Sequence, residues 1–153
     1  MTTEGMTEEE KKAVKKAMDL LLHKDRTEQE LAERLGKAGY SQGACRTALQ
    51  YVSSYGYLDD ERYARTYLEY HKDKRSKKEI RFKLEQKGIP RDVLALVLEE
   101  YDGAQEEAAV YNQLQKKLKG RSVDELDFEE KRKVMAYLAR KGYPVGVIQK
   151  VMK

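Results

Sequence analysis

Apolar residues recur along this chain at helical spacing, in short stretches separated by turns that contain glycine or proline. Between Val14 and Leu22 they stand three or four residues apart, and the same spacing returns in residues 31–38 and 45–52. No stretch alternates between apolar and polar residues for long enough to predict a strand. The pattern therefore predicts an all-α protein.

Several helix starts carry a residue that can accept a hydrogen bond from an unpaired backbone N–H group. Thr7, Thr27 and Ser76 are each followed three residues later by glutamate. This is the spacing of a capping box, in which the glutamate also accepts from the N–H of the capping residue. Each of the three is therefore predicted to start a helix with a capping box.

The middle of the chain predicts three consecutive helices within residues 59–101. Asp59 and Asp60 place a cap and negative charge at a helix start. Gly88 is suited to the left-handed conformation that ends a helix, and Pro90 suits the first turn of the next one. Ser76 divides the segment between these two points, so the segment forms a three-helix unit.

The same unit recurs before and after this segment. Residues 35–41, 84–90 and 138–144 align on a glycine, and the three glycines are 49 and 54 residues apart. Six residues after each glycine stands Cys45, Leu94 or Ile148. In the third copy the predicted cap, Asp127, stands 15 residues before its glycine instead of 12, so that helix should be about one turn longer.

Three copies of a helix triplet predict tandem three-helix repeats stacked in an elongated, curved array. The alternative is one compact domain of nine helices. The expected divisions are residues 1–12 as an N-terminal tail and helix start, and residues 13–55, 56–102 and 103–153 as repeats 1, 2 and 3. Gly103 should break the chain between the last two repeats, and residues 120–126 show no apolar periodicity.

Composition narrows the class of protein further. The 153 residues carry a net charge of +4, one cysteine and no apolar run near the roughly 20 residues that span a membrane. We therefore expect a cytoplasmic protein without an intrachain disulfide. His23, His71 and Cys45 share no metal-ligand spacing, and no phosphate loop or catalytic motif is present. The predictions are no enzyme activity, no metal and no cofactor.

The densest excess of positive charge follows residue 72. Because Ile80 and Leu84 mark the buried stripe of this helix, the basic side chains at its start point away from the core. Cations beside the free N–H groups of a helix start suit phosphates or acidic side chains. The alternative is a solvated helix face without a partner. The predicted binding residues are Lys72, Lys74, Arg75, Lys77, Lys78, Arg81 and Phe82.

Other candidate features have more ordinary explanations. Phe82 faces away from its own triplet, so it either packs on a neighbouring repeat or is exposed for a partner. Most of the eleven tyrosines are expected in core packing, Tyr63, Tyr67 and Tyr101 among them. Asp59, Asp60 and Arg62 are expected to form a cap and an inter-helix tie instead of a catalytic group. A secondary basic patch comprises Lys116, Lys117, Lys119 and Arg121.

The segment Gly56–Ala64 resembles the hallmark of the RecX family of bacterial recombinase regulators, Gly-Tyr-Leu-Asp-Asp-Glu-Arg-Tyr/Phe-Ala. A basic stretch, an Ile-x-x-x-Leu pair and Lys-Gly-Ile follow it here as in that family. The matching residues are Tyr57, Leu58, Asp59, Asp60, Arg62, Tyr63, Ile80, Leu84 and Gly88. One departure is Ser76–Glu79, where many members have Lys-Gly-Pro, so glycine-dependent detail is not carried over.

The resemblance implies binding to the RecA recombinase filament along its helical groove, with inhibition of ATP hydrolysis and strand exchange. We expect the protein to be a monomer. The resemblance thereby implies a role in recombination, DNA repair and the SOS response. The alternative is a free-standing helical protein that binds nucleic acid, single-stranded DNA included, weakly and without regard to sequence, because few side chains on its short helices suit base edges. An architectural scaffold with neither partner is a third hypothesis.

Overall fold

The computed structural model describes residues 2–153, and its regular elements in that range are α-helices and one 3₁₀ turn, so the all-α prediction is confirmed. The elements are α1 (Glu8–His23), α2 (Glu28–Lys37), α3 (Gln42–Ser54), α4 (Asp60–His71), α5 (Lys77–Gln86), α6 (Arg91–Leu98), α7 (Gly103–Leu118), η1 (Val123–Glu125), α8 (Phe128–Arg140) and α9 (Val145–Val151).

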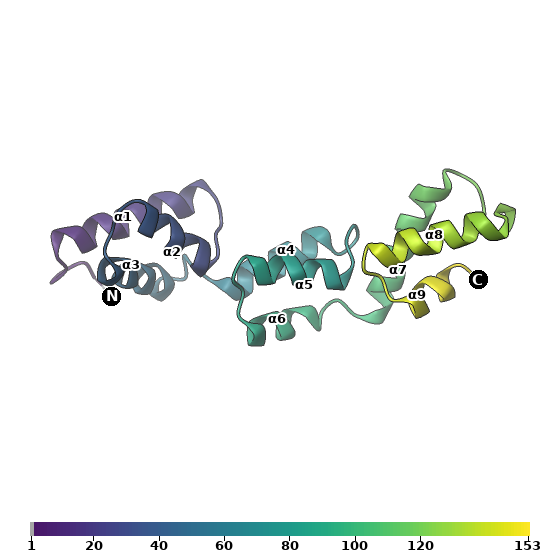
Figure 1. Cartoon of the computed structure of the whole chain (residues 1–153). Coiled ribbons are helices and arrows are strands. Elements are labelled where there is room, and N and C mark those ends of the chain that lie inside the picture. The colour runs from purple at the N-terminus through teal and green to yellow at the C-terminus, as the bar shows by residue number, and fades with distance from the viewer. Residues whose placement is uncertain (1) are drawn as a thin grey trace.

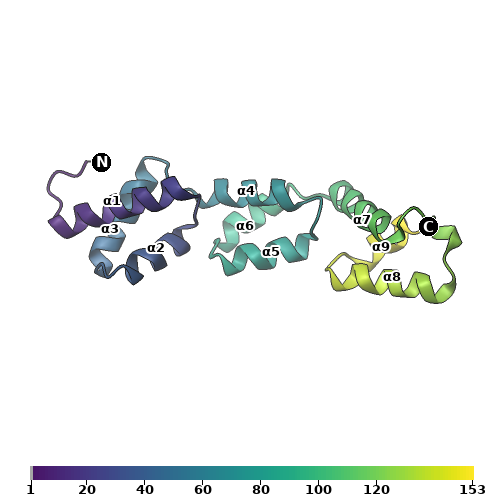
Figure 2. The same cartoon turned by 90° about the horizontal axis from the view of Figure 1, so that it is seen from above.

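The helices form three groups of three that lie in a row, with the N-terminal group at one end and the C-terminal group at the other (Figure 1). We call α1–α3 unit 1, α4–α6 unit 2 and α7–α9 unit 3. Seen from above, α2, α5 and α8 follow one another along the same side of the row (Figure 2). The elongated array of three-helix repeats is confirmed, and the compact nine-helix alternative is wrong.

Each unit encloses its own hydrophobic core. Unit 1 packs around Leu31 and Leu35, unit 2 around Ile80 and Leu84, and unit 3 around Leu114 and Leu138. An amphipathic helix buries its apolar stripe against the other helices of its unit. The apolar stripes of three helices are therefore enough to form one core. We propose residues 56–102 and 103–153 as the bounds of units 2 and 3, and we include in unit 1 the part of α1 that precedes residue 13.

Most predicted helix ends agree with the structure. Thr7, Thr27 and Asp127 form complete capping boxes. The helix that follows Asp127 has 13 residues, whereas the helices after Thr27 and Ser76 each have 10, so the predicted extra turn is confirmed. The aromatic side chain of Tyr101 is buried, and Tyr63 and Tyr67 pack on the same core, as predicted. Cys45 is only half-buried at the edge of the first core.

Two local predictions are wrong. Ser76 caps α5, but Glu79 does not complete the box, because its carboxylate lies 2.8 Å from the guanidinium of Arg75. Gly103 does not break the chain; it is the first residue of α7, which Asp102 caps through the N–H of Gln105 at 2.9 Å. A short polar cap therefore outweighed the low helix propensity of glycine. Among the described residues, no helix is long and apolar enough to cross a membrane.

Candidate functional site

Both joints between units are made by a capping hydroxyl. Thr27 Oγ1 donates to the carbonyl of Lys87 at 2.6 Å, and Ser76 Oγ donates to the carbonyl of Lys141 at 2.6 Å. Each hydroxyl also accepts from the N–H three residues onward, at 3.1 Å, which caps its helix. A hydroxyl can donate and accept at once. One small side chain at each joint thus starts a helix and holds the next unit.

A second contact also repeats at the two joints. The backbone N–H of Glu28 donates to Asp60 Oδ1 at 2.9 Å, and the N–H of Lys77 donates to the carboxylate of Glu106. Burial raises the pKa of both carboxyls, and the N–H bond opposes that rise in each. The first helix of each following unit therefore caps the second helix of the unit before it.

Gly88 and Gly142 fit closely at these joints. A Cβ on Gly88 would lie 2.5 Å from the Cβ of Gln29, and one on Gly142 would lie 2.5 Å from Ser76 Oγ. Gly39, which occupies the same place in unit 1, has nothing within 4 Å of such an atom. The glycine signal in the sequence therefore has two causes, a left-handed turn in all three units and close packing at the two joints.

The two joints differ sharply in charge. Around the second joint lie two acids, Glu79 and Glu106, and six basic residues: Lys74, Arg75, Lys77, Lys78, Arg140 and Lys141. The positions that correspond to these eight around the first joint hold Asp25, Arg26, Glu28, Gln29, Glu30, Asp60, Gln86 and Lys87, which include only two basic residues. Because both joints form the same backbone contacts, the fold does not require this positive charge.

The second joint is hollowed on its surface. One hollow of about 400 Å³ runs from Lys78 and Phe82 of α5 to Arg140 and Lys141 of unit 3. Another of about 450 Å³ lies between Tyr70, Lys74 and Lys141. Glu79 and Lys141 line both hollows, so the two adjoin. We call this surface the basic joint: Tyr70, Lys74, Arg75, Lys78, Phe82, Arg140 and Lys141.

The predicted binding residues occupy different positions around this surface. Lys74, Lys78 and Arg81 are exposed, and Lys74 Nζ lies 4.4 Å from the centre of the Tyr70 ring. Lys72 is paired instead with Glu69 at 3.0 Å. The free cations of the set therefore lie on the outer side of α5 and in the turn before it.

Arg75 is held in place within the hollow. Its guanidinium pairs with Glu79, and its Nε donates to His71 Nδ1 at 3.3 Å. Burial and the charges of Arg75 and Lys74 lower the pKa of His71, which keeps the imidazole neutral and able to accept that bond. Arg75 therefore presents a fixed charge, whereas Lys74 contacts the Tyr70 ring and Lys78 is exposed.

Two of the backbone N–H groups at the start of α5 are already bonded. The N–H of Lys77 is bonded to Glu106, and the N–H of Glu79 is bonded to Ser76 Oγ. An anion at this surface would therefore contact side-chain cations rather than the helix terminus. The phosphate seat beside this helix start stays a prediction, now centred on the side-chain cations.

Phe82 was expected either to pack on a neighbouring repeat or to be exposed, and it does each in part. Its ring lines the hollow beside Ala139 and Arg140 of unit 3, yet 56% of the residue is exposed. The corresponding residue in unit 1 is Glu33, so an aromatic ring is not needed for the joint. Phe82 thus belongs to the basic joint rather than to a core.

Sequence reasoning missed Arg140 and Lys141, which the second joint places beside Lys78 and Phe82. It also missed Tyr70 and Tyr137. The Tyr137 ring lies 5.2 Å from Lys141 Nζ and 4.3 Å from Lys117 Nζ. Lys117 of the secondary patch is therefore brought near the basic joint. One signal in the sequence could have indicated Lys141. It aligns with Lys87, and each of these lysines directly precedes a glycine that lies at a joint.

The other three residues of the secondary basic patch have different surroundings. Lys116 and Lys119 are exposed on the surface. Arg121 pairs with Glu130 at 2.7 Å and donates to the carbonyl of Glu125 at 3.2 Å, which raises the pKa of Arg121 and lowers that of Glu130. Arg121 thus ties the loop after α7 to the start of α8.

The hallmark segment has a structural role at the first joint. Asp59 caps α4, Leu58 is buried, and Arg62 donates to the carbonyl of Gly56 at 2.8 Å. Asp60 makes the contact with Glu28 described above. The predicted cap and inter-helix tie are thus both present in the structure.

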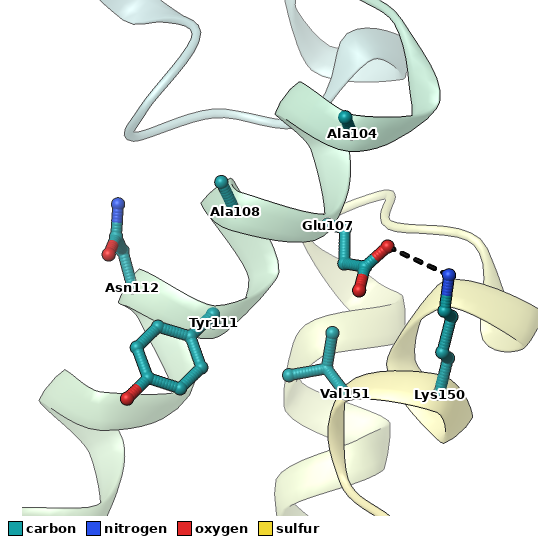
Figure 3. A pocket seen from close by; sticks show the side chains of 7 residues that line it. All are labelled: Ala104, Glu107, Ala108, Tyr111, Asn112, Lys150 and Val151. Carbon is teal, nitrogen blue, oxygen red and sulfur yellow. Dashed lines mark ion pairs between the residues drawn. The ribbon is translucent and has the colours of Figure 1, made fainter.

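Another hollow, of about 530 Å³, lies between α7 and α9. Figure 3 shows Glu107 and Lys150 pointing toward each other at this hollow, where they form an ion pair at 3.1 Å. Ala104, Ala108 and Tyr111 line it without an excess of either charge. In residues 2–153, no three His, Cys, Asp or Glu side chains gather as metal ligands. The basic joint is thus the stronger candidate site.

Comparison with known proteins identifies all three units. Family models described as the first, second and third three-helix domains of RecX match residues 13–51, 59–98 and 105–152. Crystal structures share the fold. RecX from Lactobacillus salivarius superimposes with a TM-score of 0.84 at 17% identity over 94% of each chain, and a second RecX structure gives 0.81 at 22% identity over 94% of this chain and 72% of that one.

Curated relatives named regulatory protein RecX match along most of the chain. The protein of Mycobacterium marinum is 28% identical over 99% of this chain and 87% of its own length. That of Clostridium botulinum strain Eklund 17B is 30% identical over 84% of this chain, which spans only 61% of that relative. That of Geobacillus kaustophilus is 32% identical over 95% of this chain and 54% of its own length. With three RecX domains in their family order, the chain belongs to the RecX family of regulatory proteins.

Proposed function

We propose that this protein binds the filament of a RecA-type recombinase and inhibits its ATP hydrolysis and DNA strand exchange. It would act as a monomer in the cytoplasm and modulate recombination and repair without chemistry of its own. Membership of a family of regulatory proteins supports the regulatory role. The hallmark at Gly56–Ala64 supports the identity of the partner.

The observation that carries the proposal is the repetition of one joint at two places. Thr27 and Ser76 make the same 2.6 Å bond to the following unit. Joints of this kind hold three units at fixed spacing along a row. A filament presents identical protomers at fixed spacing, so several units can bind at once, and linked contacts raise the overall affinity well above that of one contact.

Inhibition then follows from position alone. An array that binds adjacent protomers favours the arrangement of protomers to which it fits best. It resists the movements that ATP turnover requires, and it occupies space that a second DNA duplex needs. A free protomer offers only part of this surface, so the affinity for filament should exceed that for free recombinase.

A pull-down with purified recombinase tests the proposal. The recombinase is offered alone, with single-stranded DNA, and with single-stranded DNA and ATP. Retention should be strongest in the last mixture, and DNA-dependent ATP hydrolysis should fall at less than one inhibitor per protomer. Equal retention of free recombinase and filament, or no effect on ATP hydrolysis at saturation, would contradict the proposal.

A further inference from the structure

We propose that the basic joint binds a single strand of nucleic acid across units 2 and 3. Its phosphates would contact Lys74, Lys78, Arg140 and Lys141, and its bases would stack on the exposed rings of Tyr70 and Phe82. This site would operate in the isolated protein, so it does not rest on the proposed recombinase partner. It depends on residues from two units that only their docking brings together.

The charge of the joint is the first argument. Six cations meet two acids there, Glu79 and Glu106, although the first joint forms the same contacts with two basic residues among the corresponding positions. Cations gathered at one place repel each other and oppose docking of the units. Only Arg75 among them has a side-chain ion pair at the joint, with Glu79. A polyanion would remove the repulsion, which favours binding of a phosphate backbone.

The exposed rings beside the cations favour a single strand of nucleic acid. Tyr70 is 66% exposed and Phe82 is 56% exposed, and each lines one of the two adjoining hollows. Aromatic faces among cations hold single strands by stacking, because every base has a face to stack and an unpaired base is free to turn toward the ring.

The lining also predicts how the strand is read. Neither hollow is lined by Asn or Gln, the side chains that pair most readily with adenine edges. Of the two arginines with the geometry to read guanine, Arg75 is held by Glu79, and we assign Arg140 to a phosphate. Binding should therefore depend on salt and on the presence of unpaired bases, with little dependence on their order.

The position of the cations gives the strand a mechanical role. Lys74 and Lys78 belong to unit 2, whereas Arg140 and Lys141 belong to unit 3. The backbone carbonyl of Lys141 accepts the bond from Ser76, while its side chain lines both hollows. A strand lying across this surface would bridge the two units and stabilise their docking.

Fluorescence anisotropy of the isolated protein tests the site directly. The probe is a labelled oligothymidylate of about 15 nucleotides, within the length that one single-strand site usually covers. The double variant K78E/R140E reverses one exposed cation in each unit. We expect at least a tenfold loss of affinity and a salt dependence lower by about 1.4 in log–log slope, since each lost phosphate contact removes about 0.7.

The matched control is K15E/K16E, which changes the net charge equally through two exposed lysines on α1. It should lose less than threefold. F82A should lose roughly tenfold on the single strand, because stacking is absent, and a duplex of the same length should bind the unmodified protein more weakly. Melting curves by circular dichroism confirm that each variant is folded.

Three results would overturn the inference. Equal losses in K78E/R140E and K15E/K16E would mean attraction to net charge only. Equal affinity for duplex and single strand, with no effect of F82A, would remove the stacking argument. Unchanged strand binding by K78E/R140E together with lost inhibition of the recombinase would assign the joint to a protein partner, and the proposed function would then survive while this inference failed. Loss of strand binding in K78E/R140E with inhibition intact would support the site and separate it from the recombinase contact.

Discussion

A glycine follows the second helix of each unit for two reasons, a left-handed backbone and close packing at a joint. Alanine substitutions at Gly39 and Gly142 separate these two reasons. Gly39 and Gly142 both have left-handed backbones, with φ of 95° and 98°. An alanine in such a conformation costs about 1–2 kcal/mol in either unit. Nothing lies within 4 Å of a Cβ at Gly39, whereas one at Gly142 would lie 2.5 Å from Ser76 Oγ and 3.3 Å from Lys78 Cβ.

Gly142→Ala must therefore either turn the Ser76 hydroxyl aside or move unit 3 away from unit 2. The bond from Ser76 to Lys141 is then lost or lengthened, which adds roughly 1 kcal/mol, and poorer packing at the joint adds to that. We expect Gly142→Ala to cost about 1–3 kcal/mol more than Gly39→Ala. Because unit 3 keeps its own core, this extra cost should appear as undocking before unfolding.

Hydrogen exchange at the backbone amide of Lys77 reports this undocking. That N–H is bonded to Glu106 across the joint, so it should exchange faster in Gly142→Ala and at the unmodified rate in Gly39→Ala. Inhibition of the recombinase should weaken in the first variant only. Equal exchange rates at Lys77 in the two variants, with equal free energies of unfolding, would refute this account of the joint.

Three further predictions follow from the same joint. Ser76→Asp should keep its helix cap, as Asp127 does, but lose the bond to Lys141, because a carboxylate cannot donate it. The stability of the joint should fall by about 1 kcal/mol, while the circular dichroism of the helices is unchanged. Hydrogen exchange at the Lys77 amide no faster than in the unmodified protein would contradict this. A chain ending at Tyr101 should inhibit far less than the whole chain, and equal inhibition would exclude binding by several units. Burial raises the pKa of Glu106, so its folded form holds the proton more tightly and stability should fall as pH rises from the ordinary value of 4.5 through the raised one; Glu106→Gln should flatten that part of the profile in denaturant unfolding, and an unchanged profile would count against it.

Local signals were enough to predict the helices and their repetition. The apolar stripe, the capping residue and the glycine turn each act within a few residues, where chain geometry alone determines which groups meet. Where two partners compete locally, the prediction failed. Glu79 could bond to its cap or to Arg75, and it pairs with Arg75.

The sequence by itself determined three helical units and the basic character of the segment around Lys78, because both depend on neighbours along the chain. Only the tertiary structure decided that Arg140 and Lys141 complete that surface, and that Ser76 holds unit 3 in place. Sequence spacing could not reveal this, because residues so far apart meet only when two units dock. The distance between the two units depends on the hydroxyl of Ser76 and on Gly142, and the residues next to these two in the sequence do not indicate what they contact.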